Sequence, residues 1–111
     1  MKHVLFTLKG CPFEIIDDDH FIRKVLYETV KEVKANLLDL NVYKFDPQGV
    51  TGFAMISESH ISIHTWPEKE MAVCDIFTCG DGQLTDVGVE YMKTQLKATD
   101  MVSQSFIRPL E

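Results

Sequence analysis

The sequence predicts an α+β fold, a two-layer sandwich in which two helices lie on one face of a mostly antiparallel sheet. Short stretches of alternating or continuous apolar residues recur along the chain, which is typical of strands. Two longer stretches carry apolar residues at spacings of three and four, which indicates amphipathic helices. The 111 residues show no break in composition, so we expect a single domain spanning residues 1–111.

The N-terminal part is predicted to contain a strand followed by a long helix. Residues 3–8 form the strand, which ends at the turn Gly10-Cys11-Pro12. The acidic run at residues 17–19 favours a helix start, because carboxylates stabilise the unpaired amides there. A helix is therefore predicted over residues 20–37. Its inward positions are Ile22, Val25, Leu26, Val30, Val33 and Leu37.

The rest of the chain is predicted to contain five strands and a second helix. The strands cover residues 41–45, 50–57, 60–65, 71–78 and 101–107. Turns are expected at residues 46–49 and 80–82, where Pro and Gly interrupt the pattern. The second helix is predicted over residues 83–96, with Leu84, Val87 and Tyr91 facing inward and Met92 as a further candidate.

One strand carries apolar residues on both faces, which bears on assembly. In residues 50–56, Phe53 and Met55 point away from the face that holds Val50, Ala54 and Ile56. Two helices cover only one face of a sheet, so the apolar residues on the other face must be buried against something else. We predict a homodimer formed by sheet-to-sheet packing. Coverage of this face by loops is the alternative.

The composition limits the binding partners and the cellular compartment that can be expected for the protein. The net charge is −6 and basic residues are scattered, which argues against a nucleic-acid partner. The apolar runs are far shorter than the roughly 20 residues that span a bilayer, and no secretory leader is visible, so we expect a cytoplasmic protein without a membrane partner. The three cysteines lack a CxxC spacing and are expected to be free thiols.

The segment SESHISIHTWPE, residues 57–68, holds an unusual set of polar residues. On a strand, His60, Ser62 and His64 share one face, where an ordinary polar strand edge is the simplest interpretation. Two histidines four positions apart on a strand are about 13 Å apart, too far to share a zinc ion, so no metal is predicted. A Ser–His hydrolase using Ser59 lacks both a Gly-x-Ser-x-Gly elbow and a carboxylate to orient the histidine.

Three segments together resemble the prokaryotic, pyruvoyl-dependent S-adenosylmethionine decarboxylase proenzymes. They are SESHISIHTWPE at residues 57–68, DIFTCG at 75–80 and FDPQGVTG at 45–52. The similarity extends in order and spacing from the strand HVLFTLKGC to the second helix. The resemblance implies a proenzyme that cuts its own backbone between Glu58 and Ser59, giving a beta chain of residues 1–58 and an alpha chain of residues 59–111.

The resemblance also implies roles for individual residues in processing and catalysis. The hydroxyl of Ser59 attacks the carbonyl of Glu58, and His64 removes the α-proton of Ser59, leaving a pyruvoyl group. Thr51 stands where the family usually has a serine that assists processing. The pyruvoyl ketone forms a Schiff base with the substrate and accepts its electrons as CO₂ leaves. Cys79 matches the family's proton donor.

Substrate recognition is implied for Phe45, which matches the aromatic residue stacked on adenine, and Glu68, which matches the carboxylate on the ribose. The product is decarboxylated S-adenosylmethionine for spermidine synthesis. Asp46 replaces a commonly apolar residue, which leaves open an L-ornithine or L-arginine decarboxylase whose cationic substrate pairs with this carboxylate. A non-catalytic regulatory homologue is a third alternative.

Overall fold

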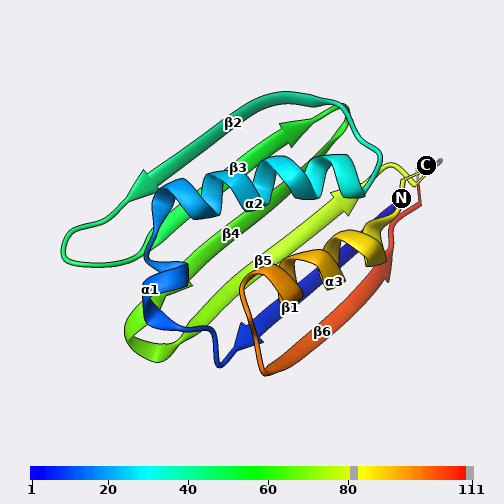
Figure 1. The fold of residues 1–111 in the computed structure, drawn as a ribbon. Helices are drawn as coiled ribbons and strands as arrows, with labels where there is room; N and C mark the ends of the chain where they lie inside the picture. The colour runs from blue at the N-terminus through cyan, green and yellow to red at the C-terminus, as the bar shows by residue number, and fades with distance from the viewer. Residues whose placement is uncertain (81–82, 110–111) are drawn as a thin grey trace.

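The computed structural model describes residues 1–80 and 83–109 as one six-stranded antiparallel sheet with three α-helices on one of its faces (Figure 1). The strand order is β2-β3-β4-β5-β1-β6. The strands are β1 Lys2–Lys9, β2 Leu37–Lys44, β3 Val50–Ile56, β4 Ser59–Trp66, β5 Met71–Thr78 and β6 Asp100–Ile107. The helices are α1 Phe13–Ile16, α2 Asp19–Glu32, α3 Thr85–Gln95 and the 3₁₀-helix η1 Pro67–Lys69. The predicted fold class is confirmed, and the sequence prediction omitted the short helix α1.

The start of α2 was predicted correctly and its end was not. The Asp18 side chain caps the helix by accepting a hydrogen bond from the Phe21 amide at 3.1 Å. The helix ends at Glu32, because Lys34 adopts a left-handed conformation with a φ of 65° and turns the chain away. Leu37, predicted to close the helix, is the first residue of β2 instead.

The buried face of α3 also differs from the prediction. Leu84 and Val87 are each 42% exposed, and the inward residues are Thr85, Gly88, Val89 and Met92. A Cβ at Gly88 would lie 2.4 Å from Cγ1 of Val33 and 3.0 Å from Cδ1 of Ile76, so the missing side chain lets α3 approach its neighbours closely. Of the predicted turn at residues 80–82, Gly80 has a φ of 100° and the other two residues lie outside the described residues.

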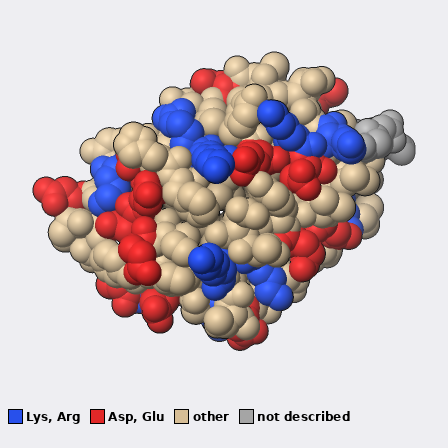
Figure 2. All heavy atoms as spheres, in the orientation of Figure 1, with Lys and Arg blue, Asp and Glu red and all other residues tan. Residues whose placement is uncertain are grey.

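The core lies between the helices and the sheet. Leu8, Ile22, Leu26, Ile61 and Ile63 are fully buried there. The outward side of the helices carries interspersed acidic and basic side chains (Figure 2), as expected of a surface in water. Among the described residues, no helix is long and apolar enough to cross a membrane.

Thr65 connects three elements through one buried hydroxyl. Its Oγ1 donates to the carbonyl of Ile16 and accepts from the amide of Val50, both at 2.9 Å. Thr65→Val keeps the shape but leaves both backbone groups unpaired, so we expect unfolding free energy to fall by about 1–3 kcal/mol. Urea denaturation measures this loss, with the exposed Thr94→Val as control. A loss no larger than that of the control would contradict the role of the hydroxyl.

The second face of the sheet carries exposed apolar side chains and lies opposite the α-helices (Figure 1). We call it the open face. Strand alternation and the pairing registers place on it Leu5, Tyr43, Phe53, Met55, Trp66, Val73, Val102 and Phe106. Each of these eight is at least 36% exposed. Apolar surface of this extent marks an interaction site in a folded protein.

Candidate active site

The predicted site residues gather at two opposite ends of the strands. Ser59 begins β4 and Cys79 follows β5, and the pairing of His60 with Phe77 places the two at the same end. His64 lies five residues further along β4, about 16 Å away at the rise of a strand. Ser59 also shares its side of the strand with the buried Ile61, whereas His64 is on the open face. The structure therefore does not bring Ser59 and His64 of one chain together.

The two residues that form the Glu58–Ser59 peptide bond each have an unusual feature. Glu58 has a φ of 59°, a left-handed conformation that costs a non-glycine residue about 1–3 kcal/mol. The Oγ of Ser59 is buried without a hydrogen-bond partner among the described residues. An orphaned buried hydroxyl is rare, because leaving it unpaired costs about 1–3 kcal/mol. Both features raise the free energy of the uncleaved chain at this bond.

His64 and Thr51 are in contact at the other end of the strands. They are paired across β3 and β4, and Oγ1 of Thr51 lies 3.1 Å from Nδ1 of His64. This hydrogen bond orients the imidazole, and Nε2 has no hydrogen-bond partner among the described residues. The hydroxyl of Thr51, which stands where the resemblance implies a serine, is therefore in direct contact with the histidine.

A cavity of about 350 Å³ adjoins this pair. It is lined by Phe45, Gln48, Gly49, Thr51, His64, Thr65, Trp66 and Glu68. The ring of Phe45 packs edge-on against Tyr43, with 4.8 Å between the ring centres. Four of the predicted residues, two proposed for processing and two for substrate binding, thus share one cavity. Asp46 is exposed in the turn after β2 and is not one of the residues that line the cavity.

Cys79 is half-buried and hydrogen-bonded to a residue that sequence reasoning missed. The side-chain oxygen Oε1 of Gln83 accepts from the Cys79 amide at 3.0 Å and from its Sγ at 3.4 Å. No sequence motif marks Gln83, whose role depends on the fold of the loop. The other two cysteines are buried. Burial raises the pKa of Cys11 to about 11 and that of Cys74 well above its ordinary value.

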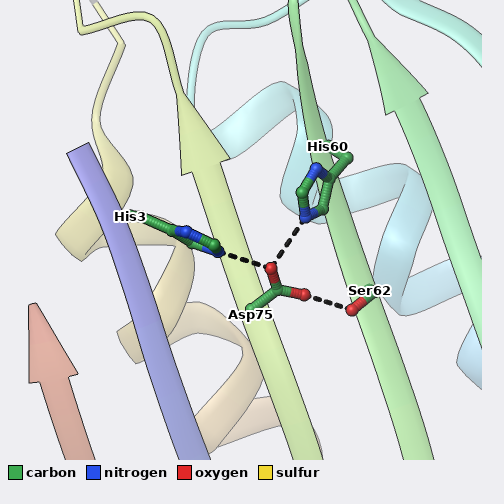
Figure 3. Close-up of polar contacts among 4 residues, drawn as sticks. All are labelled: His3, His60, Ser62 and Asp75. Carbon is green, nitrogen blue, oxygen red and sulfur yellow. Dashed lines mark hydrogen bonds and ion pairs between the residues drawn. The ribbon is translucent and has the colours of Figure 1, made fainter. Parts of the chain in front are cut away.

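A polar cluster occupies the centre of the open face (Figure 3). Asp75 on β5 accepts hydrogen bonds from Ser62 and from Nε2 of His60 and His3, the last two at 2.7 and 2.6 Å. Burial by itself raises the pKa of Asp75, but the bonds from Ser62, His3 and His60 outweigh it and hold that pKa below its ordinary value. We call these four residues the Asp75 cluster. Sequence analysis missed His3 and Asp75, which come together only through the pairing of β1 with β5.

Comparisons with known proteins identify the family of the chain. A family model described as S-adenosylmethionine decarboxylase matches residues 2–109. The S-adenosylmethionine decarboxylase proenzyme of Synechococcus sp. (strain WH7803) is 42% identical over 107 residues, covering 96% of this chain and 84% of the relative. The proenzyme of Methanococcus maripaludis (strain C5) is 51% identical over 80 residues, 72% of this chain and 66% of the relative.

A solved structure matches the whole fold. The crystal structure of the adenosylmethionine decarboxylase from Aquifex aeolicus VF5 aligns with a TM-score of 0.89 and 34% sequence identity, covering 99% of this chain and 93% of that one. The protein is thus an α+β domain of the decarboxylase proenzyme type. The chain belongs to the S-adenosylmethionine decarboxylase family, which confirms the resemblance predicted from its motifs.

Proposed function

We propose that this protein is a cytoplasmic S-adenosylmethionine decarboxylase that makes its own pyruvoyl group by cutting the chain between Glu58 and Ser59. The products of the cut are residues 1–58 and 59–111. The mature enzyme releases CO₂ from S-adenosylmethionine and supplies the decarboxylated product for spermidine synthesis. The observation that carries the proposal is the orphaned hydroxyl of Ser59 beside the left-handed Glu58. Three free cysteines fit a reducing compartment.

The processing reaction begins with Oγ of Ser59, which attacks the carbonyl carbon of Glu58. The peptide C–N bond breaks, an ester forms, and the amine of Ser59 is freed. Removal of the α-proton of Ser59 then expels the Glu58 carboxylate and leaves a carbon–carbon double bond. Water replaces the nitrogen, which departs as ammonia, and a ketone remains at the new N-terminus. Loss of the backbone strain at Glu58 favours the first step.

The base that removes the α-proton is His64, and it comes from a second copy of the chain. Within one chain the imidazole is about 16 Å away along the strand. Two open faces packed about a twofold axis, with strands running in opposite directions, would set one chain's Ser59 end against the other's His64 end. The exposed Phe53 and Met55, at 40% and 45%, supply apolar area for this contact.

The residues around Ser59 fit a pyruvoyl group. The Cα and Cβ of Ser59 become the ketone and methyl carbons of the group, while its buried, unpartnered Oγ leaves with the Glu58 carboxylate. Cys79 lies at the same end of the sheet. When present, the ketone withdraws electrons from the substrate and so supplies the electron sink for decarboxylation. The thiol of Cys79 donates the proton that replaces the lost carboxylate, and Gln83 holds it in position.

Cys79→Ala should separate processing from turnover. We expect the chain to be cleaved still, while the rate of CO₂ release falls by about 10²–10⁴-fold because the proton donor is absent. Intact-mass analysis follows cleavage and trapping of labelled CO₂ follows turnover. Cys11→Ala, at a buried cysteine outside the site, is the control for loss of a thiol. Equal turnover in the Cys79 variant and the unmodified protein would contradict the assignment.

The cavity beside His64 is the proposed place for the adenosyl part of the substrate. Phe45 offers a ring for stacking on adenine, and Glu68 offers a carboxylate for the ribose hydroxyls. In the proposed dimer this cavity faces the pyruvoyl group of the partner chain. The exposed Asp46 is not one of the described residues that line this cavity, so ornithine and arginine serve as comparisons in the assay.

The direct test of function is CO₂ release from S-adenosylmethionine, L-ornithine and L-arginine measured side by side. We expect release from S-adenosylmethionine alone, and a KM about 10-fold higher in Glu68→Gln because a hydrogen bond to a charged group is weakened. Glu70→Gln is the matched control, since Glu70 is exposed and does not line the cavity. Release from ornithine or arginine instead would replace the proposed substrate, and no release from cleaved protein would support a regulatory homologue.

A further inference from the structure

The Asp75 cluster has the composition of a metal site as well as of a hydrogen-bond network. One nitrogen from each of His3 and His60 and one carboxylate oxygen of Asp75 all lie within 4.8 Å of one another. Figure 3 shows both imidazoles directed at the same oxygen of Asp75, each from a neighbouring strand. Two imidazoles with one carboxylate is a donor set that suits divalent transition-metal ions.

The sheet holds these three ligands in place. His3 on β1 pairs with Phe77 on β5, which in turn pairs with His60 on β4, and Asp75 lies two residues before Phe77. The three ligands therefore come from three adjacent hydrogen-bonded strands, not from a mobile loop. Strands hold the geometry of a ligand set more precisely than loops do.

Aromatic rings surround the two imidazoles. Phe53 stacks on His60 with ring centres 5.5 Å apart and planes 20° apart, and Phe77 contacts His3 at 5.2 Å and His60 at 5.8 Å. Ser62 donates to the other oxygen of Asp75 and so orients the carboxylate. An apolar wall and an oriented ligand are the surroundings that tune bound metal ions in proteins.

The charges and distances are compatible with an ion after a small adjustment. The two nitrogen–oxygen distances, 2.6 and 2.7 Å, are those of hydrogen bonds. A tetrahedral ion with bonds near 2.0–2.1 Å needs its ligands about 3.3 Å apart, so each nitrogen must move away from the Asp75 oxygen by about 0.6–0.7 Å. The two nitrogens, which are at most 4.8 Å apart, must move toward the same separation of about 3.3 Å. Each imidazole would carry its proton on Nδ1 instead of Nε2, so that the lone pair of Nε2 binds the ion in place of the hydrogen bond to Asp75. The half-buried carboxylate of Asp75 would gain a divalent cation as its partner.

We propose that His3, His60 and Asp75 bind one divalent transition-metal ion per chain, with Zn²⁺ as the representative ion and water completing its coordination. The site is separate from the cavity beside His64. It also differs from the zinc site that the sequence analysis excluded, which would have required His60 and His64 to share one ion. An ion here would link β1, β4 and β5 in the middle of the open face.

The test uses the full chain carrying Ser59→Ala, so that metal binding is read without any dependence on self-cleavage. Zn²⁺ is titrated by calorimetry, and metal content is measured after dialysis. We expect one Zn²⁺ per chain, and affinity more than about 100-fold weaker in each of His3→Ala, His60→Gln and Asp75→Asn, since removing a ligand costs more than removing its support. His20→Ala, at an exposed histidine on α2, should bind like the parent.

A second measurement does not require the ligand variants to fold. In the parent chain, nitrogen NMR of the imidazoles should show Zn²⁺-dependent shifts at Nε2 of His3 and His60 and none at His20. The proposal is overturned if the parent binds no Zn²⁺, if the shifts fall on His20 or His64, or if folded cluster variants bind as tightly as the parent. Failure of self-cleavage in the unmodified protein would refute the proposed function and leave this result unaffected.

Discussion

Ser59→Ala should leave the chain in one piece. The alanine has no hydroxyl to attack the Glu58 carbonyl, so neither the ester nor the pyruvoyl group can form. We expect a single species of about 12.7 kDa and no decarboxylation at any substrate concentration. Intact-mass analysis over several days measures this directly. The loss concerns chemistry and not folding, because the hydroxyl makes no hydrogen bond among the described residues.

Ser57→Ala is the matched control for this experiment. It removes a hydroxyl from the connection between β3 and β4, two residues before the proposed nucleophile. Cleavage should proceed in this variant, with the cut still after Glu58. Cleavage of the Ser59→Ala chain, or a cut mapped to Ser57, would show that the nucleophile is misassigned.

Co-expression of two inactive chains should restore cleavage. His64→Ala removes the base and should slow processing by about 10²–10⁴-fold when expressed alone. Paired with Ser59→Ala in one dimer, however, the His64→Ala chain receives an intact imidazole from its partner. We expect about half of the His64→Ala chains to be cleaved in a random one-to-one mixture, since half of them then lie in mixed dimers. Distinct tags on the two chains identify which one is cut by mass.

The control replaces the Ser59→Ala partner with a chain carrying both Ser59→Ala and His64→Ala. That partner forms the same dimer but supplies no imidazole, so the His64→Ala chain should stay intact. If purified mixed dimers of the two single variants remain uncleaved, the base does not come from the second copy. The sheet-to-sheet arrangement proposed here would then be wrong for the processing step.

The sequence predicted the strands and the start of α2 because these depend on local patterns. Alternation marks the strands, and Asp18 marks the helix start by capping the Phe21 amide. The end of α2 was not predictable from spacing, because Leu37 continues the helical period while Lys34 turns the chain. The buried face of α3 was misassigned because a glycine, Gly88, makes the closest contact. The positions of large apolar residues do not identify the buried face of a helix where its closest contact with neighbouring elements requires a glycine.

The candidate site, like the fold, was predicted only in part. A motif was enough to select Ser59, His64 and Cys79, and strand alternation already places the first two on opposite faces. The contact of Thr51 with His64 follows from the register of β3 with β4, which the sequence does not specify. The meeting of His3 with Asp75 requires β1 to lie beside β5, a non-local pairing. Contacts between residues on strands that are adjacent in the sheet but distant in the sequence cannot be predicted from a local sequence pattern.

The most direct test of the self-processing proposal is the mass of the unmodified, freshly purified protein, recorded before and after treatment with a hydrazine that traps ketones. We predict two fragments that correspond to residues 1–58 and 59–111. The second should lack a free N-terminal amine and should gain the mass of one hydrazone. A single full-length mass that persists, and that takes up no hydrazine, would contradict the account.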